Sequence, residues 1–204
     1  MKPQEFKIIL WDFDGVIIES NSVRENGFKE VLRMFPSDQV EKLLVYHNIN
    51  GGLSRYVKFR YFFEEIRKEK ITEEKVDNLS SQFSVIMKKN LKDPNLLITP
   101  IVEFIKNQYN TGKIMHIVSG SDQVELRGLC EDLKINHFFK SINGSPTHKS
   151  KLVENVINND NELPSSYCLI GDSINDYEAA QDNSITFFGY NNQKIKNLEY
   201  YFDI

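Results

Sequence analysis

Two aspartates near the start of the chain, Asp12 and Asp14, have the side chains and the spacing that could do chemistry. They follow residues 6–11, a short apolar run that predicts a strand buried on both faces of a parallel sheet. Carboxylates two positions apart project to the same side of an extended chain, so both would stand at the end of this strand. A bound cation or a shared proton would relieve their repulsion, and a catalytic site could use either. The alternative is an ordinary turn in which aspartate makes local hydrogen bonds.

Two later clusters of small polar and acidic residues also follow apolar runs. They are Val118-Ser119-Gly120-Ser121-Asp122 and Gly171-Asp172-Ser173-Ile174-Asn175-Asp176. In an open α/β sheet, ligands bind at the carboxyl ends of the strands, so the three clusters should converge in space. Convergence favours a site over three unrelated turns.

The elements that must position these clusters alternate between strand and helix in the second half of the chain. The apolar patterns predict strands over residues 113–118, 138–142, 166–170 and 185–188, and helices over 101–109, 123–133, 149–158 and 174–181. Such alternation implies right-handed crossovers between parallel strands. We therefore expect an α/β fold with a doubly wound, Rossmann-like parallel sheet.

Between the first strand and this alternating half, residues 21–89 have helical patterns and little strand character. One helix should end before Pro36, and Ser37 is suited to be the N-cap of the next. After a loop, residues 53–70 are expected to form one aromatic-rich helix, and Thr72 to start another. We expect the aromatic stripe to be core and not a ligand site.

The overall composition narrows the class of protein. The 204 residues can bury one core and still hold a sizeable insertion. The 25 basic and 29 acidic residues are interleaved and give a net charge of −4, which argues against binding to nucleic acid.

No run approaches the ~20 apolar residues of a membrane span and no signal peptide is recognised, so we expect a soluble, cytoplasmic protein. Cys130 and Cys168 belong to no CxxC or Cys/His cluster, and both are expected to be small buried hydrophobes.

The clusters supply four carboxylates, from Asp12, Asp14, Asp172 and Asp176, without a nearby histidine or cysteine. Oxygen ligands favour a hard cation. Mg²⁺ fits best, because one or two carboxylates usually hold it while water and a substrate phosphate complete its shell.

Other residues could hold a phosphate. Ser119 and Gly120 are expected to begin a helix after a strand. The unpaired backbone N–H groups of a helix start suit a phosphate. The alternative is that Ser-Gly after a strand is only a helix cap and a turn. Lys149 and Lys151 begin the next predicted helix against its dipole, so one of them could serve a charge outside the helix. At least one of the two is expected to be a solvated surface lysine. Together the carboxylates, a metal, a hydroxyl and a lysine describe phosphoryl transfer. The chain has no GxxxxGK[ST] P-loop.

The sequence resembles the haloacid dehalogenase superfamily, whose four motifs occur in order. They are Asp12-Phe13-Asp14-Gly15-Val16, Ser119 in Ile117-Val118-Ser119-Gly120-Ser121, Lys149, and Gly171-Asp172-Ser173-Ile174-Asn175-Asp176. The resemblance implies that Asp12 attacks phosphorus to form an aspartyl-phosphate, and that Asp14 protonates the leaving oxygen and later activates water. Ser119 would hold the phosphoryl oxygens, and Lys149, which suits the family's helix better than Lys151, would neutralise nucleophile and phosphate.

The resemblance also implies a metal site and a cap. Mg²⁺ would be bound by Asp12, the Asp14 backbone carbonyl and Asp172, with Asp176 in support. The helical insertion resembles the α-helical cap of the β-phosphoglucomutase and phosphoglycolate phosphatase subgroup, so we expect a core domain over residues 1–19 and 94–204 and a cap domain over 20–93. Within Gly52-Leu53-Ser54-Arg55, Arg55 resembles the cap arginine that meets the far end of the substrate; a surface arginine is the alternative.

These features predict an enzyme, a Mg²⁺-dependent phosphatase of a small phosphorylated metabolite such as a sugar phosphate. Asp14 supports phosphate chemistry, because the dehalogenases that give the superfamily its name lack an aspartate there. A phosphomutase is the first alternative, although residues 144–149, Gly-Ser-Pro-Thr-His-Lys, differ from the Gly-Lys-Pro-x-Pro more usual in a mutase. A non-catalytic binding protein of the same fold is the second. No nucleic-acid or membrane partner is expected, and the sequence does not specify the substrate or the oligomeric state.

Overall fold

A parallel sheet of six strands forms the centre of the protein, whose computed structural model describes residues 1–204. The strands are β1 (Ile8–Trp11), β2 (Ile114–Asp122), β3 (Ser141–Ser145), β4 (Tyr167–Gly171), β5 (Thr186–Gly189) and β6 (Tyr200–Tyr201). Their order is β3-β2-β1-β4-β5-β6, and every neighbouring pair is parallel. Central β1 pairs Ile8 with Ile114 of β2 on one side and with Tyr167 of β4 on the other. The expected α/β fold with a parallel sheet is confirmed.

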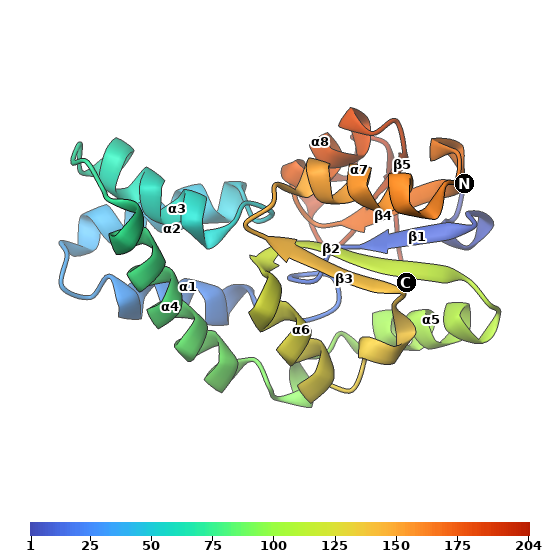
Figure 1. Ribbon diagram of the computed structural model, residues 1–204, viewed down its shortest axis with the longest axis horizontal. Helices are drawn as coiled ribbons and strands as arrows, with labels where there is room; N and C mark the ends of the chain where they lie inside the picture. Colours follow the sequence, from blue (N-terminus) through green and yellow to red (C-terminus); the bar gives the residue numbers. More distant parts are fainter.

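Helices cover both faces of the sheet (Figure 1). Helices α5 (Thr99–Asn110) and α6 (Gln123–Asp132) pack on one face, and α7 (Lys149–Asp160) and α8 (Ile174–Asp182) on the other. Side chains of β1 alternate between these layers, with Ile9 and Trp11 in the first core and Ile8 and Leu10 in the second. Because both faces are covered, all four residues of β1 are fully buried, which explains the unbroken apolar run.

Four helices between β1 and α5 lie together beside the sheet, and we call them the insertion (Figure 1). They are α1 (Asn21–Val31), α2 (Ser37–Ile49), α3 (Arg55–Tyr61) and α4 (Glu73–Asn90), with a π-helical turn at Phe62–Ile66 after α3. The division into two domains at residues 19/20 and 93/94 stays a prediction.

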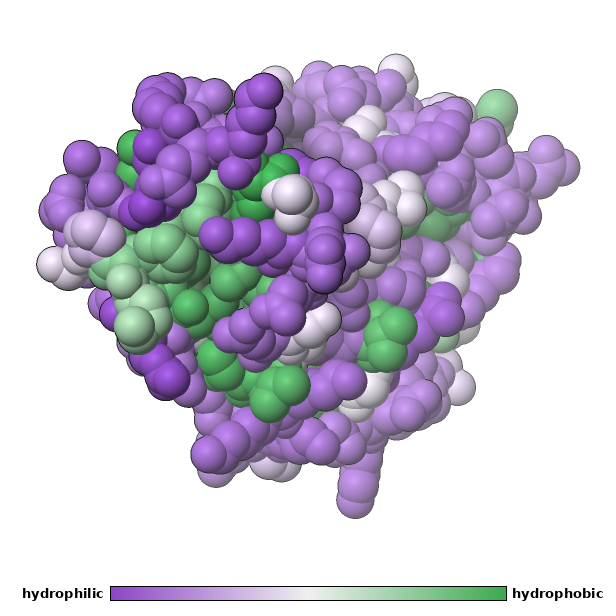
Figure 2. All heavy atoms as spheres, turned by 60° about the vertical axis from the view of Figure 1, so that its left-hand side comes forward, coloured by the Kyte–Doolittle hydropathy of each residue, from purple (hydrophilic) through white to green (hydrophobic).

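The insertion has an aromatic interior under a polar surface. Phe28 of α1 lies 4.5 Å from Phe83 of α4 and 5.4 Å from Phe59 of α3, measured between ring centroids. Figure 2 turns this half of the molecule forward and shows a mainly hydrophilic face on which apolar residues gather in one area. The buried phenylalanines confirm that the aromatic stripe is core.

Two predicted boundaries near the site are wrong. Strand β2 continues to Asp122 instead of ending at Val118, so Ser119 and Gly120 lie in the strand and do not open a helix. Helix α6 begins at Gln123, because the Asp122 side chain accepts hydrogen bonds from the backbone N–H groups of the first turn. Strand β3 begins at Ser141 instead of residue 138, since a 3₁₀ turn occupies the preceding residues.

Within the insertion, the segment predicted as one helix over 53–70 is shorter and irregular. It begins after Ser54, whose side chain caps α3, and Lys68 adopts a left-handed φ of 58° beyond the π-helical turn. Ser37 is the first residue of α2, and Pro36 takes the N-cap position. The predicted start at Thr72 is confirmed, because its side chain caps α4.

Short 3₁₀ turns and a small edge strand complete the chain. The turns are Pro3–Glu5, Pro94–Leu96, Asn136–Phe138, Pro164–Ser166 and Gln193–Ile195. The C-terminal segment returns to the sheet through β6, which pairs with β5. Cys130 and Cys168 are buried and free, as expected. None of the helices has both the length and the apolar character needed to cross a membrane.

Candidate active site

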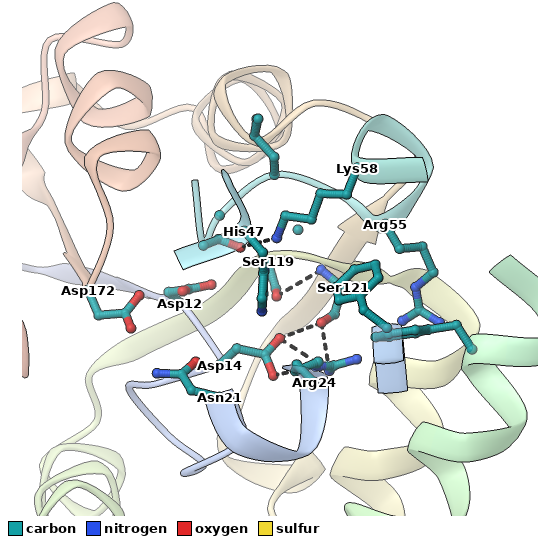
Figure 3. Close-up of a pocket in the computed structure, with 16 residues that line it drawn as sticks. Asp12, Asp14, Asn21, Arg24, His47, Arg55, Lys58, Ser119, Ser121 and Asp172 are labelled. Carbon is teal, nitrogen blue, oxygen red and sulfur yellow. Dashed lines mark hydrogen bonds and ion pairs between the residues drawn. The ribbon is translucent and has the colours of Figure 1, made fainter. Parts of the chain in front are cut away.

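The three polar clusters meet in a cavity between the carboxyl edge of the sheet and the insertion (Figure 3). Asp12 follows β1 directly, Ser119 lies near the end of β2, and Asp172 follows β4. From the insertion, the loop at Gly51 and Gly52 and side chains of α1 to α4 complete the lining. The structure therefore shows the convergence that the sequence predicts.

Asp12 is bound by the lysine that the sequence analysis preferred. Lys149 Nζ lies 2.7 Å from Asp12 Oδ1 and is also ion-paired with Asp176, and all three residues are buried. Burial by itself would lower the pKa of Lys149, but the two carboxylates outweigh it and raise this pKa, so the ammonium stays charged. Lys151 instead lies at the surface, 2.7 Å from Glu154. Of the two candidate lysines, the structure brings only Lys149 to the clusters.

A second carboxylate, that of Asp172, accepts no hydrogen bond from the protein and lies beside Asp12 and Asp176. One carboxylate oxygen from each of these three residues lies within 4.8 Å of the others. Burial and the two neighbouring carboxylates raise the pKa of Asp172 well above its usual value. Three carboxylates face one ammonium, that of Lys149, so the cluster has an excess negative charge that a divalent cation would neutralise.

The three acids are not equally available as metal ligands. Asp176 Oδ2 accepts hydrogen bonds from the backbone N–H and the hydroxyl of Ser173, at 2.9 and 2.6 Å, and Asp176 Oδ1 is bound to Lys149. This capping arrangement leaves Asp12 and Asp172 to contact an ion directly, with Asp176 behind them. All donors are oxygens, so the residues present fit a hard cation such as Mg²⁺.

Gly15 allows the loops after β1 and β4 to approach each other. Its φ is +73°, and a Cβ added there would lie 2.0 Å from Asp172 Oδ2. Any other residue would both strain the backbone and displace this carboxylate. The glycine that follows Asp-x-Asp therefore has a steric reason in this chain.

Asp14 has a different environment from Asp12. Its carboxylate accepts hydrogen bonds from the Ser20 and Ser121 hydroxyls, each at 2.5 Å, and Arg24 Nε donates to it at 2.9 Å. Burial by itself would raise the pKa of Asp14, but Arg24 and the two hydroxyls outweigh it and lower this pKa to about 2. The two aspartates therefore have separate cations: Asp14 is paired with Arg24, whereas Asp12 shares Lys149 with Asp176.

A chain of buried ion pairs connects Asp14 to the insertion. Arg24 Nη1 lies 2.7 Å from Glu125 Oε1, and Arg55 Nη1 lies 2.7 Å from Glu125 Oε2. Arg55 also donates to Ser84 and lies over the Phe83 ring, 4.7 Å from its centroid. Arg55 lines the cavity and is only 4% exposed, so it is not a surface arginine. Its charge is already neutralised by the ion pair with Glu125.

Sequence reasoning missed Arg24, His47, Lys58 and Glu125, which are all buried at or beside the cavity. A weak signal existed for Arg24, because Gly27 and Phe28, three and four positions later, are buried on the same helical face. Helical spacing cannot tell such a residue from one at the edge of the apolar face. The contacts that give these side chains a role come from distant parts of the chain.

The insertion is closed over Ser119 and Gly120. Ser119 is buried, and a Cβ added to Gly120 would lie 2.2 Å from the Gly52 carbonyl oxygen. A cavity of about 40 Å³ remains between the Gly52 loop and the carboxyl edge of the sheet.

The sequence of this chain matches the model of one protein family. The sequence model described as haloacid dehalogenase-like hydrolase matches residues 9–190. A 5'-nucleotidase of Pseudomonas aeruginosa is 24% identical over 187 residues, which cover 89% of this chain and 80% of that protein.

Solved structures share the fold at low identity. The β-phosphoglucomutase of Clostridium difficile has a TM-score of 0.75 and 15% identity, covering 95% of this chain and 87% of that one. A predicted phosphoglycolate phosphatase from Haemophilus somnus has a TM-score of 0.69 and 17% identity, covering 98% of this chain and 89% of that one. At these identities the likeness shows the fold.

Proposed function

Because this chain belongs to the haloacid dehalogenase-like hydrolase family, we propose that it is a Mg²⁺-dependent phosphatase of a small phosphorylated metabolite. The observation that carries the proposal is the arrangement around Asp12, whose carboxylate is 2.7 Å from Lys149 and lies beside the unpaired carboxylate of Asp172. An anionic nucleophile, a fixed ammonium and a site for a divalent cation are what transfer of a phosphoryl group to a carboxylate requires.

In the first step Asp12 attacks phosphorus, forming an aspartyl-phosphate as the ester oxygen leaves. Lys149 offsets the negative charge shared by Asp12 and the phosphoryl oxygens, which would otherwise repel each other. The hydroxyl of Ser119, at the end of β2, holds a phosphoryl oxygen close to the backbone of Gly120. Bound by Asp12 and Asp172, with the backbone carbonyl of Asp14, Mg²⁺ would supply charge stabilisation for the transferring group.

Asp14 takes the proton-transfer role. As a carboxylate it can accept a proton from the water that hydrolyses the aspartyl-phosphate. To protonate the leaving oxygen in the first step, it must first bind a proton, and the contacts with Arg24, Ser20 and Ser121 oppose this. We therefore expect the Arg24 contact to loosen when substrate occupies the cavity.

Hydrolysis is favoured over the mutase alternative by the sequence of residues 144–149, which end at Lys149. These residues, Gly-Ser-Pro-Thr-His-Lys, differ from the Gly-Lys-Pro-x-Pro that is more usual in a mutase. The names of the similar proteins include a 5'-nucleotidase, a phosphatase and a mutase, and therefore do not choose one substrate. A cytoplasmic location also stays a prediction.

Hydrolysis of p-nitrophenyl phosphate, with and without Mg²⁺, tests the proposal. We expect turnover that requires Mg²⁺, and a fall of at least about 1,000-fold for Asp12→Asn, which removes the nucleophile. Asp132→Asn is the matched control, because Asp132 is an exposed residue paired with Lys92 and should keep full activity. If neither this ester nor a panel of phosphorylated metabolites is hydrolysed, the protein is a binding protein of the same fold and the proposal is wrong.

A further inference from the structure

One buried cation lacks a counter-charge. Four lysine and arginine side chains are buried, and three of them, Arg24, Arg55 and Lys149, are ion-paired. The fourth, Lys58, has no carboxylate oxygen within 4.0 Å, and its Nζ donates only to the carbonyl oxygen of Gly51, at 3.0 Å. A buried ammonium without a partner is costly, so its presence calls for an explanation.

Lys58 extends from α3 into the cavity that contains the nucleophile (Figure 3). Burial lowers the pKa of Lys58 to about 7, and the positive charges of Arg24, Lys149 and Arg55 act in the same direction, while Asp14 opposes them. No group of the protein supplies the missing charge at this position. An anionic ligand in the cavity would both neutralise Lys58 and use its two remaining N–H donors.

Two neighbouring groups of the insertion also have unused hydrogen-bonding capacity. His47 Nδ1 and Arg55 Nη2 are buried without a partner, and both residues line the same cavity. His47 is held neutral, because burial together with Lys58 and Arg24 lowers its pKa to about 2. A ligand group with several acceptor oxygens would accept hydrogen bonds from Lys58, from Arg55 and, in the tautomer with a proton on Nδ1, from His47, whereas an alkyl group would accept none.

We propose that Lys58 binds a second anionic group of the substrate, a carboxylate or a phosphate distinct from the one that is transferred. This inference rests on the proposed phosphatase function and gives its substrate class: short phosphate monoesters with another anionic group. Arg55 is the less suitable cation, because Glu125 already neutralises it, so it adds an N–H donor while Lys58 adds the charge. Because Lys58 and Asp12 line the same cavity, a short metabolite can place its two anionic groups at both residues.

Matched pairs of esters test this role. The first pair is 2-phosphoglycolate and 2-hydroxyethyl phosphate, in which a carboxylate replaces a hydroxymethyl group. The second pair is propane-1,3-diol bisphosphate and 3-hydroxypropyl phosphate, in which a second phosphate replaces a hydroxyl. In at least one pair the wild-type protein should prefer the more anionic ester in kcat/KM by about 30-fold or more. In Lys58→Met this preference should fall to near one, and Lys58→Arg should keep part of it.

Controls separate this role from others. Lys42→Met removes the same charge from an exposed position of the insertion and should leave the preference unchanged. An equal loss for both members of each pair in K58M would mean that Lys58 contacts the transferred phosphate, and would overturn the inference. So would a wild-type protein that hydrolyses p-nitrophenyl phosphate but prefers neither anionic ester. Failure to hydrolyse any ester, by contrast, contradicts the proposed function itself.

A melting experiment gives a second readout that does not depend on turnover. If Lys58 is unpaired in the free protein, K58M should melt at a higher temperature than wild type, because methionine fills a similar volume without a buried charge. A lower melting temperature would show that the contacts of Lys58, including its hydrogen bond to the Gly51 carbonyl, outweigh the cost of the buried charge, and would overturn the inference.

Discussion

Replacing Glu125 by glutamine tests the closed arrangement of the insertion over the sheet. Glu125 belongs to α6, which packs on the sheet, and its two carboxylate oxygens bind Arg24 and Arg55 of the insertion at 2.7 Å each. Its side chain is completely buried. Glutamine keeps the shape but removes the charge, so both guanidinium groups lose their shared counter-ion.

The size of the effect follows from what each arginine keeps. Removing one partner of a buried ion pair typically costs about 3–5 kcal/mol of unfolding free energy. Arg24 still has Asp14, whereas Arg55 keeps only Ser84 as a polar partner, so we expect the lower end, about 3 kcal/mol. For a chain of this size that corresponds to a fall in Tm of roughly 6–12 °C.

Urea unfolding of wild type and E125Q, followed by circular dichroism, measures this difference directly. Glu103→Gln is the control, since Glu103 is exposed and its pair with Lys106, at 3.1 Å, should contribute less than about 0.5 kcal/mol. A loss below about 1 kcal/mol for E125Q would show that water reaches Glu125 in solution. The insertion would then not be closed over α6 in solution, and the cavity between them would be open to water.

Four further substitutions test separate parts of the site. Asp14→Asn should lower kcat by at least about 100-fold. The variant should keep its Mg²⁺ affinity in calorimetry, because the proposed metal contact of Asp14 is its backbone carbonyl. Asp172→Ala, in contrast, should lose Mg²⁺ binding. The pKa of His47 is lowered to about 2 in the folded protein. Below pH 6.5 the unfolded chain therefore binds a proton that the folded protein does not, so the free energy of unfolding decreases as the pH is lowered. Between pH 7 and 5 the loss in urea unfolding should be about 2 kcal/mol larger for wild type than for His47→Gln, and equal losses would contradict a neutral buried His47. Gly120→Ala should push the Gly52 loop away, because the added Cβ would lie 2.2 Å from the Gly52 carbonyl oxygen. We expect faster proteolysis of the insertion and a kcat/KM lowered by about 10-fold. A variant with unchanged proteolysis and kcat/KM would mean that the Gly52 loop does not lie against Gly120.

Much of the fold was predictable because burial on both faces leaves a clear pattern. The unbroken apolar run at β1 and the alternation of later elements gave the parallel sheet, and Thr72 marked the start of α4 through its capping side chain. The end of β2 was not predictable, because Ser119 and Gly120 are compatible with strand or turn and only the capping by Asp122 fixes where α6 begins. The irregular end of α3 likewise depends on how its aromatic side chains pack.

The candidate site was predictable in its core and not in its surroundings. Asp12, Asp172 and Lys149 follow or begin regular elements, so the topology of a parallel sheet brings them to one edge. Lys58 gave no signal, because helical spacing does not report whether a charged side chain has a partner.

The sequence by itself determined that carboxylates, a hydroxyl and a lysine collect at the carboxyl ends of parallel strands. Only the tertiary structure decided which charges meet: Asp12 with Lys149, Asp14 with Arg24, and Arg55 with Glu125, residues 70 positions apart. Local spacing specifies secondary structure, because its hydrogen bonds and apolar faces repeat over short intervals. The energy of a charge depends instead on distance and burial, which are fixed only when distant segments pack together. That packing turned two similar aspartates into groups with separate environments and left Lys58 without a counter-charge.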